Sequence, residues 1–123
     1  LNVPNVTFIN LQYVDYVEDI ARVEDEFGVK IHNFDDIDQY GDIDEVAALC
    51  AALDIVVSTK VTPPMISAGV GTPTKIANWR QSSFNNILNN PNITSFEMFD
   101  RDTGQSWDNV FETIAEKISI SNN

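Results

Sequence analysis

The sequence is poor in cysteine, in basic residues and in long apolar runs. Its single cysteine, Cys50, excludes an intramolecular disulfide and a cysteine metal cage, as is typical of proteins in the reducing cytoplasm. Lys and Arg number 7 against 19 Asp and Glu, and the resulting net charge of −12 repels phosphate backbones and anionic lipid. No apolar run approaches the roughly 20 residues that cross a bilayer, and residues 1–5 lack the pattern of a signal peptide. We therefore expect a cytoplasmic protein with no nucleic-acid, membrane or metal partner.

The remaining composition is that of a folded domain. Hydrophobic residues make up 43% of the 123 residues, which lies well outside the range of disordered segments. A chain of this length has enough apolar side chains for one core and too few for two. We expect a single domain over residues 1–118, followed by a polar and disordered tail over residues 119–123.

Five short segments have the composition of β-strands. They are Val6–Leu11, Val29–His32, Ile55–Ser58, Thr74–Ala77 and Thr94–Phe99. Between the strands, apolar residues recur at the spacing of a helix. The first predicted helix ends at Gly28, and the second begins at Asp42, with Glu45 three positions later in the capping-box arrangement. Further helices are predicted from Pro63 and Pro64 to Gly71, over Ser82–Leu88, and from Ser106 or Asp108 to Ile118.

The alternation of strands and helices predicts an α/β fold. We expect a Rossmann-like, open parallel sheet of about five strands with helices on both faces. Right-handed crossovers give the strand order 2-1-3-4-5, which places strand 1 beside strand 3 at the switch point. Ligands of such sheets bind beyond the carboxyl ends of the strands, so the loops after Leu11, His32, Ser58 and Ala77 are where we expect a site.

The segment Ser58–Met65 is the leading candidate for an anion site. It follows the third predicted strand and opens a helix, and a helix N-terminus offers free N–H groups and a partial positive charge. Lys60 and the hydroxyls of Thr59 and Thr62 add donors for a phosphate or diphosphate. An ordinary βα loop with a solvated Lys60 explains the same residues, and this alternative stays open.

Four further side chains follow predicted strands at the same edge. Gln12 follows strand 1, His32 ends strand 2, and Trp79 and Arg80 follow strand 4. Trp79 is suited to stack on a base or sugar, Arg80 to clamp a phosphate or carboxylate, and His32 to contact a ligand or act as a base. The alternatives are that Trp79 plugs the sheet end, Arg80 pairs with an acid and His32 is an ordinary packed or surface residue.

The acidic stretch from Asp35 to Glu45 imitates the start of a calcium-binding EF-hand loop. Ala47 stands at the twelfth position, where such a loop needs a bidentate Glu. We interpret the stretch as a solvated loop and helix cap. A dinucleotide-binding fingerprint is excluded, because Gly69 and Gly71 lie at a helix end instead of after a strand. A response-regulator receiver is largely excluded, because no acceptor Asp stands at the end of strand 3.

Four segments resemble one protein family. They are Ile9–Gln12 (INLQ), Phe27–Phe34 (FGVKIHNF), Asp42–Ser58 (DIDEVAALCAALDIVVS) and Met65–Pro73 (MISAGVGTP). Together they resemble the C-terminal, nucleotide-sugar-binding half of GT-B glycosyltransferases, in particular heptosyltransferase-like domains and those attached to tetratricopeptide repeats. The resemblance implies that a nucleoside diphosphate sugar binds as substrate, with no cofactor, near Lys60, Thr62 and Met65. It implies that Gln12, His32 and Trp79 lie near the base, ribose or sugar.

The chain departs from this family at three positions of the diphosphate loop. Lys60 stands where the family has Asp, Val61 where it has Thr, and Met65 where it has His. The family's first strand, which precedes Val6, is also missing, and closing the gap leaves the order 2-1-3-4-5. The resemblance implies a partner region, either an acceptor-binding half or tetratricopeptide repeats, and in inverting members that half supplies the catalytic base. The alternative is a degenerate, non-catalytic module that serves as a scaffold or interaction domain.

Overall fold

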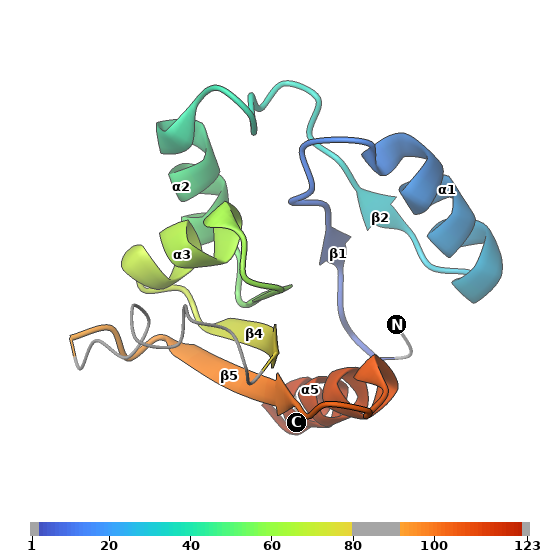
Figure 1. The fold of residues 1–123 in the computed structure, drawn as a ribbon. Helices are drawn as coiled ribbons and strands as arrows, with labels where there is room; N and C mark the ends of the chain where they lie inside the picture. The colour runs from blue at the N-terminus through green and yellow to red at the C-terminus, as the bar shows by residue number, and fades with distance from the viewer. Residues whose placement is uncertain (1–2, 80–91, 122–123) are drawn as a thin grey trace.

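The computed structural model describes residues 3–79 and 92–121, and it has the predicted α/β class (Figure 1). All its paired strands are parallel. The strands are β1 (Phe8–Ile9), β2 (Ile31–His32), β3 (Val56–Ser58), β4 (Thr74–Trp79) and β5 (Phe96–Arg101). The helices are α1 (Tyr16–Phe27), α2 (Ile43–Ala52), α3 (Thr62–Gly69) and α5 (Trp107–Ser121). The predicted helix Ser82–Leu88 lies outside the described residues.

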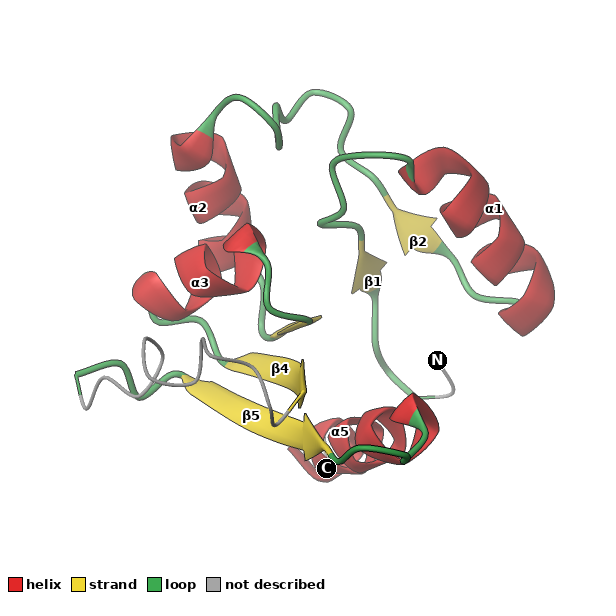
Figure 2. Cartoon of the chain, in the orientation of Figure 1, coloured by secondary structure: helices red, strands yellow, loops and turns green. Residues whose placement is uncertain are grey.

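The strands form two sheets instead of one. β1 pairs with β2 in a two-stranded sheet, and β3, β4 and β5 form a three-stranded sheet in that order (Figure 2). The predicted neighbours 2-1, 3-4 and 4-5 are therefore confirmed, but the predicted pairing of β1 with β3 is wrong. Instead of pairing, β1 and β3 face each other across a space lined by apolar side chains, and α2 packs against α3.

The three-stranded sheet has a helix layer on each face. Side chains alternate between the faces of a strand, and along β4 Thr74 and Ile76 face α3, while Ala77 faces α5. The α5 side is an apolar cluster in which Ala77 and Phe99 pack against Val110 and Ile114. The expected helices on both faces are therefore found for this sheet.

Buried hydroxyl groups fix α3 to the start of β4. Ser67 is fully buried and donates to Thr74 Oγ1 at 2.7 Å, while Thr74 donates in turn to the carbonyl of Thr72 at 2.8 Å. Thr72 donates to the carbonyl of Cys50 at the end of α2, also at 2.8 Å. This chain satisfies polar groups that would be costly to bury alone, and it ties α2, α3 and β4 together.

The helix boundaries follow the predicted signals closely. Gly28 ends α1 with a left-handed φ of 63°, and Asp42 caps α2 by accepting from the amides of Asp44 and Glu45. Glu45 does not complete the capping box, because its carboxylate accepts instead from the Asp38 amide at 2.7 Å. α5 continues to Ser121, so the first residues of the predicted disordered tail are helical, and the Ser119 and Ser121 hydroxyls donate to carbonyls four residues earlier.

The region formed by β1, α1 and β2, which we call the N-terminal unit, has almost no core. Among residues 3–45, Asn10 alone is buried, and Val17 on α1 is 69% exposed. By contrast, the C-terminal unit, formed by β3 to β5 with α2, α3 and α5, contains every buried apolar side chain of the described residues. No helix within the described ranges combines the length and the apolar character needed to cross a membrane.

Candidate functional site

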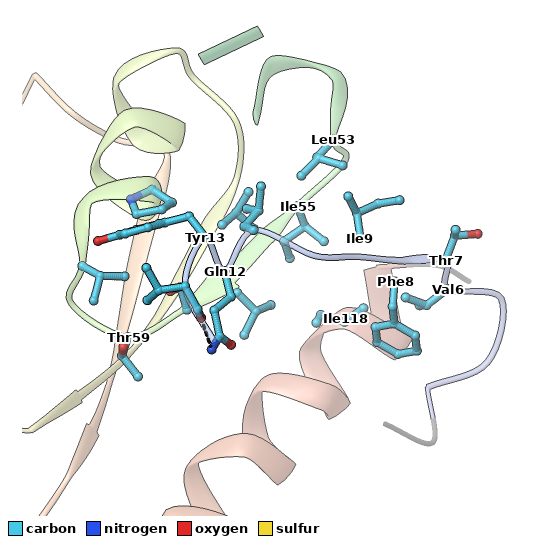
Figure 3. Close-up of a pocket in the computed structure, with 17 residues that line it drawn as sticks. Val6, Thr7, Phe8, Ile9, Gln12, Tyr13, Leu53, Ile55, Thr59 and Ile118 are labelled. Carbon is cyan, nitrogen blue, oxygen red and sulfur yellow. Dashed lines mark hydrogen bonds between the residues drawn. The ribbon is translucent and has the colours of Figure 1, made fainter. Parts of the chain in front are cut away.

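A cleft of about 550 Å³ separates the two sheets (Figure 3). Its body is lined by apolar side chains of both sheet edges, including Phe8 and Ile9 of β1 and Val57 of β3, and Ile118 of α5 contributes from below. The cleft therefore occupies the place where strand 1 was expected to pair with strand 3.

One end of the cleft is polar and lies at the carboxyl ends of the strands. Gln12, from the loop after β1, lines it together with Ser58 and Thr59, which end and follow β3, and with Pro63 of α3. In open parallel sheets, ligands bind in the crevice where the strand order reverses. The structure thus brings Gln12 to the same crevice as the loop after β3, although the two segments are far apart in sequence.

The start of α3 offers fewer backbone donors than expected. Of the four amide positions that a helix normally leaves free there, Pro63 and Pro64 have no N–H, and the Val61 amide donates to the Thr59 carbonyl at 2.9 Å. The amide of Thr62 is the one that remains for a ligand. The expected cradle of backbone amides is therefore wrong, and an anion at this end would depend on side chains.

The side chains around the start of α3 can replace some of the missing backbone N–H donors. Thr62 and Met65 are exposed on the first turn, whereas Pro63 and Pro64 are buried beneath it. Burial lowers the pKa of Lys60, and the negative charge of Asp100 at the end of β5 partly offsets this shift. Asp100 therefore competes with any anionic ligand for the Lys60 ammonium group.

Asn10 positions the loop that carries Gln12, and sequence reasoning missed it. This side chain, 8% exposed, donates to the Gln12 carbonyl at 2.8 Å and to Asn33 Oδ1 at 2.9 Å, and it accepts from the Gln12 amide at 2.9 Å. It thereby joins the loops after β1 and β2. An amide side chain inside the apolar run Val6–Leu11 was the available signal, because a buried polar group in a strand must have partners.

Gln12 itself is exposed and turned toward its own loop. Its side-chain amide donates to the carbonyl of Val14 at 3.0 Å. His32 ends β2, the outer strand of the small sheet, and it does not line the cleft. Of the predicted site residues, the structure therefore brings Gln12 to the crevice, whereas His32, Lys60, Thr62 and Met65 do not line it.

Trp79 lies at the end of β4, half exposed, beside an arginine that was not predicted. The guanidinium of Arg101 lies 5.7 Å from the centre of the Trp79 ring and 4.7 Å from that of Trp107. These contacts hold Trp79 at the carboxyl edge of the three-stranded sheet through cation–π attraction. Arg80 lies outside the described residues.

A second, more polar hollow of about 380 Å³ lies over the acidic loop after β2. Tyr13 and Tyr40 meet there with ring centres 5.8 Å apart. Asp38 accepts from the amides of Tyr40 and Gly41, so this carboxylate stabilises the loop. Within residues 3–79 and 92–121, no three Asp, Glu, His or Cys side chains gather as a metal site.

Comparison with known proteins finds a partial relative. The chain is 45% identical over 73 residues to Protein FlbA of Caulobacter vibrioides, a match that covers 59% of this chain and 12% of FlbA. The chain therefore spans a small part of that relative. No family model matches the sequence, and no solved structure matches it.

Proposed function

We propose that this chain is the donor-binding part of a glycosyltransferase and that it holds a nucleoside diphosphate sugar at the polar end of the cleft. The observation that carries the proposal is the convergence of Gln12 with Ser58 and Thr59 at one end of the cleft between the two parallel sheets. The resemblance of four segments to GT-B donor domains supports the same ligand class.

The diphosphate would be held mainly by side chains in this proposal. Thr59 lines the cleft, and Lys60 and Thr62 follow it in the chain without lining the cleft themselves. In the proposal Lys60 supplies the positive charge, and the hydroxyls of Thr59 and Thr62 with the Thr62 amide supply hydrogen bonds. Gln12 and Tyr13 line the opposite side of the crevice and face the base, ribose or sugar. No described side chain is assigned as a catalytic base, because the resemblance assigns that role to the acceptor-binding half.

Calorimetric titration of the full-length protein with UDP, ADP and GDP tests this function. We expect one nucleoside diphosphate to bind and the Lys60→Ala variant to bind it about tenfold or more weakly, since a charge-assisted hydrogen bond contributes about 1.5–3 kcal/mol. Lys30→Ala is the matched control, because Lys30 is exposed just before β2 and its substitution removes the same charge at a position away from the cleft. Absence of binding at millimolar nucleotide, or equal weakening by both variants, would contradict the proposal.

A second candidate function is a non-catalytic module of the same ancestry that serves as a scaffold. The specific observation in its favour is the pair Pro63 and Pro64, which removes two of the amides that a diphosphate would use. The net charge of −12 also disfavours anions. Silent nucleotide titrations of a protein that is folded by circular dichroism would favour this candidate.

A further inference from the structure

The hollow of about 380 Å³ over the loop from β2 to α2 (Figure 1), which we call the loop hollow, is bordered by exposed aromatic rings. Tyr40 is 80% exposed, and Tyr13 and Phe34 are 41% and 40% exposed. The Tyr13 and Tyr40 rings are tilted by 56° with their centres 5.8 Å apart, so they form two sides of a corner. Rings that meet in this way around a hollow are suited to hold a cation against their faces.

The same hollow contains carboxylates with unused acceptor oxygens. Asp35, Asp36 and Asp38 line it, and no Lys or Arg does. Asp38 uses Oδ1 for two amides of the loop, and Asp35 uses Oδ1 for the Asn33 side chain, so one oxygen of each remains. Asp36 makes no hydrogen bond or ion pair with the described part of the chain. A ligand that fits this hollow is therefore a hydrogen-bond donor with a positive charge.

The basic residues of the N-terminal unit are engaged elsewhere. Arg22 pairs with Asp19 at 3.0 Å and Lys30 with Glu24 at 3.3 Å, and none of these four residues lines the loop hollow. Carboxylates around one hollow repel one another, and a cation between them relieves that repulsion. The net charge of −12 also attracts a basic partner to the protein. The charge of the hollow is thus complementary to a cation that the described residues do not supply.

Buried hydrogen bonds hold the loop hollow in shape. Asn10, which joins the loops after β1 and β2, also accepts through its carbonyl from the Gln39 side chain at 3.3 Å. Asn33 donates to the Tyr16 hydroxyl at 3.4 Å, which links the loop to the start of α1. Because the walls are ordered without a partner, binding costs less conformational entropy than it would for a mobile loop.

We propose that the loop hollow binds an arginine side chain of a basic polypeptide partner. A guanidinium is planar, so it can stack on the Tyr13 or Tyr40 ring and donate in its own plane to a carboxylate. A lysine ammonium has no face to stack, and a quaternary ammonium has no N–H to donate. A polypeptide that carries the arginine also buries the exposed rings of Phe34 and Tyr40, which a free small cation would leave in water.

This inference goes beyond the nucleotide site and does not depend on it. Tyr13 lines both the cleft and the loop hollow, but Asp36 and Tyr40 line the hollow without lining the cleft. Lys60, the cation of the proposed nucleotide site, does not line the hollow. Lys60→Ala therefore tests the nucleotide proposal, while substitutions of Asp36 and Tyr40 test the arginine proposal.

Saturation-transfer NMR of the full-length protein with an acetylated and amidated peptide, Gly-Ser-Arg-Ser-Gly, tests the proposal. We expect millimolar binding, with the largest saturation on the arginine side-chain protons. The same peptide with citrulline, which keeps the planar shape but has no charge, should bind about tenfold or more weakly. A peptide with lysine should bind about threefold or more weakly, because it cannot stack.

Two variants place the binding in the loop hollow. Tyr40→Ala and Asp36→Asn should each weaken binding of the arginine peptide about fivefold or more, and both side chains are exposed, so the fold is retained. Tyr40→Phe keeps the ring and should bind as the natural protein does. Asp54→Asn is the matched control, because Asp54 is exposed before β3 and does not line the hollow.

Four results would overturn the proposal. They are no binding of the arginine peptide at millimolar concentration, equal binding of the arginine and citrulline peptides, equal binding of the arginine and lysine peptides, and equal weakening by Asp36→Asn and Asp54→Asn. The last result would show general attraction of the peptide to a negatively charged protein.

Discussion

The N-terminal and C-terminal units have the same strand-and-helix pattern but very different packing. α1 has the stronger amphipathic pattern, yet none of its residues is buried, whereas α2 buries Val46, Leu49 and Cys50. The difference teaches that an amphipathic helix acquires a core only where a neighbouring element covers its apolar stripe. For α2 that neighbour is α3, whereas no described element buries a residue of α1.

The largest expected effect compares the two sheets directly. Ile76 is fully buried in β4, whereas Ile31 is only partly buried in β2. We expect Ile76→Ala to lower the free energy of unfolding by about 2–5 kcal/mol, because it leaves a cavity in the core. Ile31→Ala should cost clearly less in urea denaturation. Equal losses of unfolding free energy in the two variants would contradict this comparison, because they would show that both units share one core.

The next effect concerns the buried hydroxyl chain of the C-terminal unit. Ser67→Ala removes the donor to Thr74, and we expect a loss of about 1–2 kcal/mol in the free energy of unfolding. Ser121→Ala is the matched control, because the Ser121 hydroxyl is exposed at the end of α5. A loss as small as that of the control would mean that the buried hydrogen bond contributes little.

A smaller effect is expected at the boundary between the units. Asp42→Ala removes the side-chain cap of α2, which should cost about 1 kcal/mol. Asp42→Asn should retain most of this stability, since an amide oxygen can accept the same two bonds. Thermal denaturation followed by circular dichroism checks both variants, and an Asn variant as unstable as the Ala variant would contradict the capping role.

The smallest expected effect is the pH dependence of Glu97. Hydrogen bonds from Lys117 and Lys75 lower the pKa of this carboxyl below its ordinary value of 4.5. A folded-state pKa below the unfolded one means that the stabilisation is present above about pH 4.5 and disappears as the pH falls through the folded value. Glu97→Gln should therefore be less stable than the natural protein at pH 7, and the difference should shrink as the pH falls below about 4.5.

The urea midpoints of both proteins, measured from pH 3 to pH 7, give this comparison. The carboxylate is 44% exposed, so solvent screening keeps the difference small. A difference between the two proteins that stays constant over this range would contradict the role of the ion pairs.

The sequence predicted the local structure better than the long-range contacts. Gly28 and Asp42 are local signals, and the structure confirms the helix boundaries they indicated. The five predicted strands are found, but β1 and β2 have only two residues each, and the predicted helix Ser82–Leu88 lies outside the described residues. The pairing of β1 with β3 depends on what covers β1, which local patterns do not contain. The predicted strand order therefore made β3 a neighbour of β1, and the structure does not show this pairing.

The candidate site illustrates the same limit at single residues. Gln12 reaches the crevice because Asn10 fixes its loop, and a hydrogen-bond network across two loops cannot be derived from spacing. The shortage of amides at α3 was predictable, because Pro63 and Pro64 lack an N–H in any fold. The contact of Arg101 with Trp79 required the three-dimensional register of β4 and β5.

Hydrogen exchange of the full-length protein with and without saturating UDP, ADP or GDP tests the central claim most directly, since the proposed site combines loops of both units. The account predicts slower exchange on binding at Gln12 and Tyr13 and also at Lys60 and Thr62. Unchanged exchange in these two loops, with a nucleotide bound elsewhere or not at all, would contradict it.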